Sequence, residues 1–265
     1  MNARVAVPLI DRGSGPPLLV FHGWSGSNRN VERWLPALEP SFRVIVPDLP
    51  GCDRVAPLRE RHTADAYAAW ALSVLDGLGV RDAYVGGLCS GSAVALALAR
   101  RAPERVRGLL LHTPFLGRAL LRPLIRLQLE ALASPAGSLY GPLRHASFLA
   151  TLHRRLFANA AEVAAEQLAA DQDDLVRADA RAARELATDL LQGDRLAVLR
   201  GWHRPVGVLV ADADAFIDVP GVVAAVRDAA PQTAIEVIAG GHGWTDAFVA
   251  AQHVALVRLA ASLLA

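Results

Sequence analysis

The stretch Ala83–Ala97, with the sequence AYVGGLCSGSAVALA, decides the fold of this 265-residue chain. It begins with a short apolar run typical of a strand, passes through a turn bounded by Gly87 and Gly91, and ends in small residues typical of a helix. The turn matches the nucleophile-elbow pattern G-x-nucleophile-x-G, in which x is any residue. In that turn the central residue sits on a strained backbone at the end of the strand. Here the central residue is Cys89.

Two other interpretations of this stretch stay open from the sequence. Centring the turn on Ser90 would put Leu88 at a flanking position, where the strand and helix backbones nearly touch and a minimal side chain is required. Alternatively, Cys89 is a buried and inert residue of a glycine-rich turn, because free cysteine is often a small core residue. We favour Cys89 as the central residue, because Gly87 and Gly91 then occupy both flanks.

Length and composition limit the class of protein. A chain of 265 residues, 53% of them apolar, can form one α/β domain with an insertion. The net charge of +1, without a separate basic block, argues against nucleic-acid binding. The sequence shows no signal-peptide core at its start and no apolar run that approaches membrane-spanning length. We therefore expect a cytoplasmic protein without nucleic-acid or membrane partners.

Apolar runs and helical patterns alternate on both sides of the elbow. The predicted strands are Val5–Ile10, Leu18–Phe21, Phe42–Val46, the elbow strand, Val106–Leu111, Val206–Ala211 and Ala234–Ile238. The predicted helices are Asn30–Leu38, a helix capped by Thr63 and ended by Gly77 and Gly79, the elbow helix to Arg101, Gly221–Asp228 and a C-terminal helix. This alternation predicts an α/β fold with a mostly parallel sheet flanked by helices.

The alternation stops between the two halves of the predicted sheet. Residues 115–204 are rich in alanine, leucine and arginine and helical in pattern. We expect them to form an inserted helical cap on a core of residues 1–114 and 205–265. Within this segment Arg118, Arg122 and Arg126 recur at intervals of four, which would place them on one helix face. That face is either a docking stripe for an anionic group or, more commonly, a solvated surface.

Small residues follow the predicted strand Leu18–Phe21, in the run His22-Gly23-Trp24-Ser25-Gly26-Ser27. Such a loop can direct backbone N–H groups into the space above a sheet, as an oxyanion site requires, although it can also be an ordinary surface turn. A histidine buried at a strand end, as His22 would be, more often braces a loop by hydrogen bonds than acts in catalysis.

Five motifs carry a resemblance to a known family. They are His22-Gly23-Trp24, Asp48-Leu49-Pro50-Gly51, Gly87-Leu88-Cys89-Ser90-Gly91, Ala211-Asp212-Ala213-Asp214 and Gly241-His242-Gly243. With these motifs in the order nucleophile, acid, histidine, the chain resembles the α/β-hydrolase-fold family with a helical cap. The resemblance covers essentially the whole chain outside the cap.

The resemblance implies a role for each matching residue. Cys89 would be the nucleophile, His242 the general base and later acid, and Asp214 the group that orients the imidazole. The backbone N–H groups of Trp24 and Ser90 would form the oxyanion hole.

Other residues near these motifs receive weaker assignments. Asp214 is preferred over Asp212 and Asp218, because the family usually places its acid there. His253 is disfavoured, because it lies inside the final predicted helix. Trp24, Phe216 and Trp244 stand beside the predicted catalytic residues, which suggests an aromatic substrate-binding pocket or simple packing. Cys52 receives no role.

Cys89 differs from the serine that is more common at the nucleophile position of this family. A helix N-terminus and a nearby imidazole both stabilise a thiolate, so Cys89 would depend less on base activation than serine does. Its acyl-enzyme would be a thioester, which exchanges readily with thiols and amines. Cysteine at this position resembles dienelactone hydrolases, polyester synthases and some thioesterase domains of biosynthetic assembly lines.

Three functions are compatible with the sequence. The first is hydrolysis of a small-molecule ester, thioester or lactone through an acyl-Cys89 intermediate, with the acyl substrate free or linked to a carrier or to coenzyme A. The second is acyl transfer or cyclisation on the same three residues, and the third is ligand binding without catalysis. We expect no cofactor and no metal, because the sequence has no ligand cluster and no phosphate-cradling motif.

Overall fold

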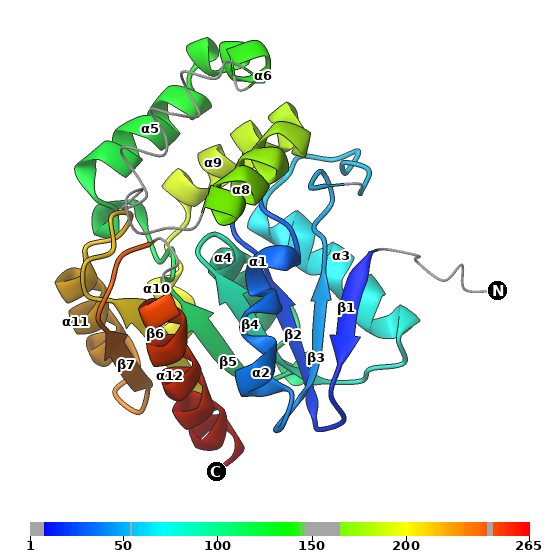
Figure 1. Cartoon of the computed structure of the whole chain (residues 1–265), viewed down its shortest axis with the longest axis vertical. Helices are drawn as coiled ribbons and strands as arrows, with labels where there is room; N and C mark the ends of the chain where they lie inside the picture. The colour runs from blue at the N-terminus through cyan, green and yellow to red at the C-terminus, as the bar shows by residue number, and fades with distance from the viewer. Residues whose placement is uncertain (1–7, 54, 144, 146–164, 243–245) are drawn as a thin grey trace.

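Seven strands form one sheet, whose carboxyl-terminal edge carries the loops discussed below (Figure 1). The computed structural model describes residues 8–53, 55–143, 145, 165–242 and 246–265. The strand order is β1-β3-β2-β4-β5-β6-β7, with β1 antiparallel to β3 and every other pair parallel. The strands are β1 (Leu9–Arg12), β2 (Pro17–Phe21), β3 (Arg43–Pro47), β4 (Ala83–Leu88), β5 (Val106–His112), β6 (Val206–Ala211) and β7 (Ala234–Ile238). The prediction of a mostly parallel sheet is confirmed.

Continuous apolar runs produce the central strands. Leu18–Phe21 of β2 is completely buried, and all six residues of β6 are buried as well. Parallel strands take this composition because helices cover both of their faces. The register places Phe21 of β2 beside Gly87 of β4, so the loops after these two strands begin at the same level of the sheet.

Helices cover the two faces as separate layers. On one face α12 (Asp246–Leu264) packs against α2 (Leu35–Leu38) and against β5, β6 and β7. On the other face the successive neighbours are α3 (Ala64–Gly77), α4 (Gly91–Arg101), α10 (Leu196–Arg200) and α11 (Val219–Ala229). The remaining short elements of the core are α1 (Arg29–Glu32) and the 3-10 turn η1 (Pro103–Arg105).

Two boundaries differ from the sequence prediction. The predicted helix Asn30–Leu38 is two short helices, because Pro36 has no N–H to donate and would clash with the carbonyl of Glu32, where α1 ends. The first strand is Leu9–Arg12, not Val5–Ile10, and residues 1–7 lie outside the described part of the chain.

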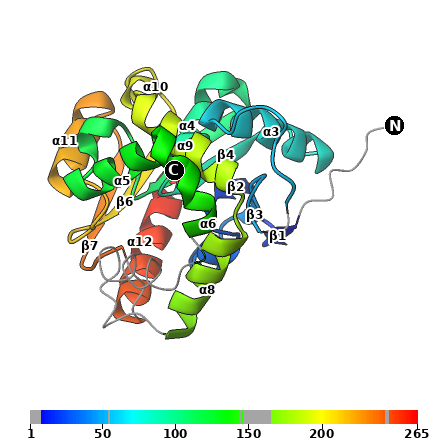
Figure 2. The same cartoon turned by 90° about the horizontal axis from the view of Figure 1, so that it is seen from above.

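The described residues between β5 and β6 form helices and no strand, as expected for a cap. The elements are η2 (Arg118–Leu120), α5 (Pro123–Ala133), η3 (Pro135–Leu139), α6 (Tyr140–Leu143), α8 (Ala165–Arg177), α9 (Ala180–Gln192) and α10. α5 packs against α9, and Figure 1 shows α8 and α9 above the carboxyl ends of the central strands, with α5 and α6 farther from the sheet; Figure 2 shows the same helices from above. α10 instead packs on α4 and α11, so the end of this segment joins the core layer. The domain boundaries at 114 and 205 stay a prediction.

The arginine spacing of the cap does not form one helix face. Arg118 lies in the 3-10 turn η2, Arg122 has an extended backbone, and α5 begins only at Pro123. Both Arg118 and Arg126 reach Glu130 as ion pairs. The expectation of three aligned arginines is therefore wrong, because Pro123 starts a new helix in the middle of the series.

The last helix is unusually apolar. Ala247–Leu264 of α12 has a mean hydropathy of 1.6 over 18 residues, which meets the length and composition of a membrane-spanning helix. The expectation that no apolar run approaches that length is thus wrong for α12. Buried residues of α12, among them Leu256, Leu259 and Leu263, form part of the apolar core, and 39% of this window is buried.

Candidate active site

Cys89 occupies a strained turn between β4 and α4. Its φ of +54° lies in the left-handed region that non-glycine residues rarely adopt. Its N–H donates to the carbonyl of His112 at 2.9 Å, and its carbonyl accepts hydrogen bonds from the N–H and Oγ of Ser92. These contacts to β5 and to the first turn of α4 stabilise a backbone conformation that is otherwise unfavourable for cysteine.

The two flanking glycines have no room for a side chain. A Cβ on Gly87 would lie 2.3 Å from the backbone of Gly91, and a Cβ on Gly91 would lie 2.3 Å from the carbonyl oxygen of Phe21. Ser90, by contrast, has a helical φ of −63° at the start of α4. The elbow geometry is therefore centred on Cys89 and not on Ser90.

Asp214 and His242 form a hydrogen-bonded pair above the end of the sheet. Nδ1 of His242 lies 2.9 Å from Oδ2 of Asp214. Oδ1 of Asp214 accepts from the N–H groups of Phe216 at 2.7 Å and Ile217 at 3.2 Å, and the residue is fully buried. The loop after β6 therefore wraps around this carboxylate and aims its other oxygen at the imidazole.

The other acidic residues near this loop have different partners. Asp212 accepts a hydrogen bond from the N–H of Gly240 at 3.0 Å, and Asp218 stands at the start of α11. His253 lies in α12, where its Nε2 donates to the carbonyl of Arg33 at 2.6 Å. None of these side chains is hydrogen-bonded to His242 in the described part of the chain.

Electrostatics favour a protonated His242. Burial alone would lower its pKa, but the charge and hydrogen bond of Asp214, together with the hydrogen bond and charge of Cys89, raise the pKa to about 10. Burial would likewise raise the pKa of Asp214, yet the charge of His242 and the hydrogen bonds it accepts hold it below its usual value. The structure thus sets an imidazolium between a carboxylate and the sulfur of Cys89.

The three aromatic residues predicted to bind substrate have different situations. The ring of Phe216 stacks on His242, and so contacts the predicted base. Nε1 of Trp24 donates to the carbonyl of Ala183 in α9 at 3.0 Å, and the Trp24 ring lies 5.8 Å from that of Tyr140. Trp244 lies outside the described residues. Substrate binding by these residues stays a prediction.

The loop after β2 passes directly beside Cys89. A Cβ on Gly23 would lie 3.5 Å from the Cβ of Cys89. Within the described residues, the backbone N–H groups of Trp24 and Ser90 donate to no protein acceptor. One of these amides follows Cys89 in the chain and the other follows Gly23, which lies beside Cys89, so the oxyanion-hole prediction is compatible with the structure.

His22 braces this loop, as the sequence interpretation favoured. Its Nδ1–H donates to the carbonyl of Gly23 at 2.9 Å, and its Nε2 accepts from the N–H of Leu49 at 3.0 Å. Burial lowers the pKa of His22 to about 4, against the raising effect of the Gly23 carbonyl. The ring is therefore neutral, with its proton on Nδ1, and ties the loop after β2 to the loop after β3.

His112, at the end of β5, received no role from the sequence. Its carbonyl holds the N–H of Cys89, its Nδ1 lies 3.1 Å from Oγ1 of Thr113, and its Nε2 lies 2.8 Å from Nε2 of Gln252 in α12. Burial, and then the charge of His242, lower the pKa of His112 to about 3. The sequence signal that could have identified His112 is its position as a polar residue at the end of a buried strand next to the elbow.

The remaining groups of interest do not add a metal or redox site. Burial, reinforced by the charge of Asp48, raises the pKa of the Cys52 thiol, so this cysteine is an inert core residue. Among the described residues, no group of three or more histidine, cysteine, aspartate or glutamate side chains is arranged to hold a metal ion.

Comparisons with known proteins agree with the fold. The sequence model of the alpha/beta hydrolase fold matches residues 16–244. The chain is 38% identical over 116 residues to a 2-hydroxymuconate semialdehyde hydrolase of Pseudomonas sp. (strain CF600), which is 41% of this chain and 40% of that protein. It is also 38% identical over 110 residues to the dihydrolipoyllysine-residue acetyltransferase component of an acetoin cleaving system from Pseudomonas putida, 40% of this chain and 29% of that protein.

Among solved structures, the chain resembles a thermophilic esterase from Thermogutta terrifontis in its malate-bound form. The TM-score is 0.74 at 25% sequence identity, over 89% of this chain and 86% of the esterase. The structural match thus extends over almost the whole chain, whereas the two sequence matches cover less than half the length of either relative.

Proposed function

Because the chain belongs to the α/β-hydrolase fold family, we propose that it hydrolyses a small-molecule ester, thioester or lactone through an acyl-Cys89 intermediate. One observation carries the proposal: the His242 ring lies between the Asp214 carboxylate and the Cys89 sulfur, and the sulfur sits on the elbow turn. A nucleophile, a base and an orienting acid in this arrangement are the parts of acyl-transfer catalysis.

Acylation follows from these positions. The Cys89 sulfur attacks the carbonyl carbon and forms a C–S bond, while the π electrons move onto the carbonyl oxygen. The N–H groups of Trp24 and Ser90 stabilise that oxyanion. When it collapses, the bond to the leaving group breaks, and His242 gives its proton to the departing oxygen or sulfur. The product is a thioester on Cys89 with a neutral imidazole beside it.

Deacylation uses the same groups in reverse. Neutral His242 takes a proton from water as the water oxygen attacks the thioester carbon. The oxyanion forms in the same hole and collapses as the C–S bond breaks, which releases the acid and leaves the Cys89 sulfur beside protonated His242. Asp214 stabilises the imidazolium in both half-reactions, since its carboxylate is buried and already hydrogen-bonded to Nδ1.

The chemistry of sulfur narrows the substrate class. A thiolate is a good leaving group, so an intermediate formed from an amide would tend to expel Cys89 again instead of the amine. Thioesters, activated esters and strained lactones have leaving groups that compete with a thiolate. We therefore propose these carbonyl compounds, free or linked to a carrier or to coenzyme A, as the substrates.

Transfer to another acceptor is a second candidate reaction. The observation that favours it is the local similarity to a protein named as an acetyltransferase component, together with the ready exchange of a thioester with thiols and amines. Hydrolysis and transfer share the acylation step and differ only in what attacks the acyl-enzyme.

Intact-mass spectrometry tests the proposal. The protein is incubated with p-nitrophenyl acetate, phenyl thioacetate and dihydrocoumarin, each alone and with an added thiol or amine. We expect one acyl adduct in wild type and in the matched control Cys52→Ala, and none in Cys89→Ala. kcat/KM of Cys89→Ala should fall by about 10³-fold or more. Turnover that survives in Cys89→Ala, or no adduct and no turnover with any of the three donors, overturns the proposal.

A further inference from the structure

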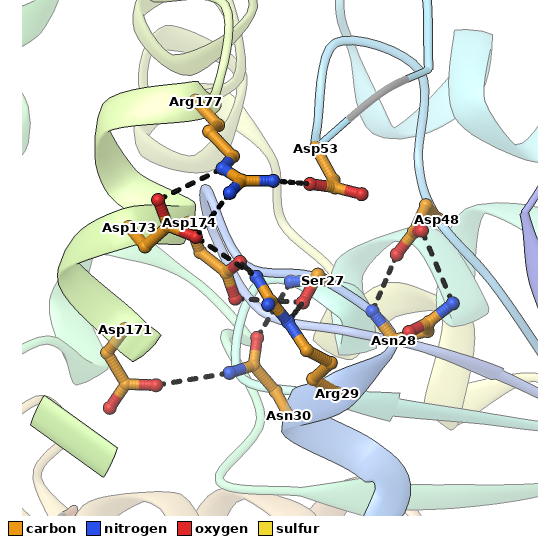
Figure 3. A network of polar contacts seen from close by, with 10 residues as sticks. All are labelled: Ser27, Asn28, Arg29, Asn30, Asp48, Asp53, Asp171, Asp173, Asp174 and Arg177. Carbon is orange, nitrogen blue, oxygen red and sulfur yellow. Dashed lines mark hydrogen bonds and ion pairs between the residues drawn. The ribbon is translucent and has the colours of Figure 1, made fainter. Parts of the chain in front are cut away.

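A network of polar side chains joins cap helix α8 to the loops after β2 and β3 (Figure 3). Asp171, Asp173, Asp174 and Arg177 come from α8, and they face residues of the two core loops and of the first turn of α1. The core members are Ser27, Asn28, Arg29, Asn30, Asp48 and Asp53. We call this set the cap–loop network.

Asp174 is the buried member on the cap side. Its exposed fraction is only 2%, and it accepts a hydrogen bond from Oγ of Ser27 at 2.8 Å and an ion-paired hydrogen bond from Arg29. Arg29 also donates to Oγ of Ser27 at 3.2 Å. A buried carboxylate with two such partners holds them firmly, because losing either partner leaves a desolvated charge.

The core side of the same loop is held by Asp48. The backbone N–H of Asn28 donates to Oδ1 of Asp48 at 2.6 Å, and Nδ2 of Asn28 reaches Oδ2 at 3.3 Å. The N–H of Ser27 donates to Oδ1 of Asn30 at 2.9 Å, and Asn30 reaches Asp171 of α8 at 3.3 Å. The loop is therefore held between the core below it and α8 above it.

This loop is the one that carries the backbone N–H of Trp24. The carbonyl of Gly23 accepts from the N–H of Gly26, so the turn at Trp24 leads directly to Ser27. The Trp24 side chain is itself tied to α9 through the carbonyl of Ala183. Both cap helices thus contact the segment that follows Gly23, the residue that lies beside Cys89. An oxyanion donor acts only when it is held within a fraction of an ångström of its working position.

We propose that Asp174 is a positioning residue for the oxyanion hole, which it holds in place from the cap through Ser27 and Arg29. The inference rests on the function proposed above and adds that the cap takes part in the chemistry as well as covering the site. A displacement of α8 would loosen the amide of Trp24 without touching Cys89 or His242.

Two reactions of the same sulfur separate this role from general damage. Acylation by p-nitrophenyl acetate builds negative charge on a carbonyl oxygen and uses the oxyanion hole. Alkylation by iodoacetamide forms the C–S bond as iodide leaves, and no oxyanion develops. A residue that positions the hole should therefore affect acylation and leave alkylation unchanged.

The variants are Asp174→Asn, Asp174→Ala and Ser27→Ala, with Glu130→Gln on cap helix α5 as the control. Glu130 is also a cap carboxylate, but it is 35% exposed and pairs with Arg118 and Arg126, outside the cap–loop network. We expect Asp174→Ala to lower kcat for the ester about tenfold or more with KM unchanged, since the lost interaction acts only in the transition state. Asp174→Asn and Ser27→Ala, which keep part of the network, should show smaller losses in the same direction.

Alkylation of Cys89 should proceed within about twofold of the wild-type rate in every variant, and Glu130→Gln should match wild type in both reactions. Ester turnover at the wild-type rate in Asp174→Ala overturns the inference. So does an equal loss of acylation and alkylation, which would indicate general disruption of the site. Wild-type protein that shows no acyl adduct and no turnover with any of the three donors would instead overturn the proposed function, so the two failures are distinguishable.

Discussion

Phe216 and His242 lie face to face, with ring centroids 3.8 Å apart and 27° between the ring planes. The backbone N–H of Phe216 also donates to Asp214, the carboxylate that binds His242. One residue therefore holds both members of the acid–base pair, by its side chain and by its backbone. The groups that face His242 are the carboxylate of Asp214, the sulfur of Cys89 and neutral His112. An aromatic face adds to these by attracting a protonated ring.

Replacing Phe216 by leucine should make His242 easier to deprotonate. The substitution leaves the backbone N–H in place but removes the aromatic face, which is worth about 1 kcal/mol to a cation. The pKa of His242, which is about 10 in wild type, should fall by about 0.5–1 unit. An NMR titration of the imidazole, assigned with a His242→Gln variant, measures this shift. Phe216→Tyr, which keeps the face, should titrate like wild type; identical curves for Phe216→Leu and wild type would contradict the prediction.

Replacing Asp214 by asparagine should remove most of the catalytic activity. The largest influence that raises the pKa of His242 is lost, so that pKa falls and the imidazolium that Asp214 stabilises becomes harder to form. We expect kcat with p-nitrophenyl acetate to fall by about 10²–10⁴-fold. Asp218→Asn, a change in the same loop that leaves the His242 contact intact, serves as the control. A comparable fall of kcat in both variants would show that catalysis depends on the structure of the loop and not on the Asp214 carboxylate.

The same pair should make folding stability decline in alkaline solution. The pKa of His242 is raised in the folded state, so its proton stabilises the fold fully below about pH 6.5, and this contribution is lost as the pH rises to about 10. In Asp214→Asn that alkaline decline should largely disappear. Urea unfolding of both proteins between pH 6 and pH 10 gives the comparison, and parallel curves would be inconsistent with a charged pair.

Glycine at position 91 should be indispensable for folding. A methyl group there would overlap the carbonyl oxygens of Phe21 and His22, which are parts of the backbone and cannot move aside. Gly91→Ala should lose about 3 kcal/mol of stability or more. Gly77→Ala provides the control, because nothing lies within 4 Å of its added Cβ and alanine favours the end of α3 by about 0.5–1 kcal/mol. In thermal unfolding, the melting temperature should fall in Gly91→Ala and rise in Gly77→Ala relative to wild type.

His22 should make the protein sensitive to mild acid. Its pKa is lowered to about 4 in the folded protein, whereas the unfolded chain takes up the proton near pH 6.5. Stability present above pH 6.5 is therefore lost as the pH falls toward 4, by about 2 kcal/mol between pH 7.5 and pH 5. His22→Gln, which cannot titrate, should be less stable than wild type at pH 7.5, and the difference should shrink by that amount at pH 5. Urea titrations at the two pH values measure it.

Much of the site could be predicted because the elbow depends on neighbouring residues. Gly87, Cys89 and Gly91 lie within five positions of each other, and the clash that excludes larger flanking residues is a property of the turn itself. The split of α1 and α2 at Pro36 could also have been anticipated, since proline has no N–H wherever it occurs. The prediction from the arginine spacing in the cap was wrong, because residues four apart share a face only when one helix contains them all, and α5 begins after Arg118 and Arg122.

The contacts that define the chemistry join distant parts of the chain. Asp214 and His242 are 28 positions apart. From the sequence, Asp214 was preferred over Asp212 only because the family usually places its acid at that position. The structure distinguishes them, because the loop after β6 turns two N–H groups onto Asp214 while Asp212 faces Gly240. The sequence assigned no functional role to His112 or Asp174, because each acts on residues carried by other elements.

The sequence by itself determined the alternation of buried strands with helices and the position of a cysteine on the tightest turn between them, because both follow from steric and apolar constraints among adjacent residues. Only the tertiary structure decided which carboxylate meets the imidazole, that Phe216 stacks on it, and that Asp174 reaches Ser27 across 147 positions. Those contacts depend on the order of strands in the sheet and on where α8 packs, and no local pattern of residues specifies either.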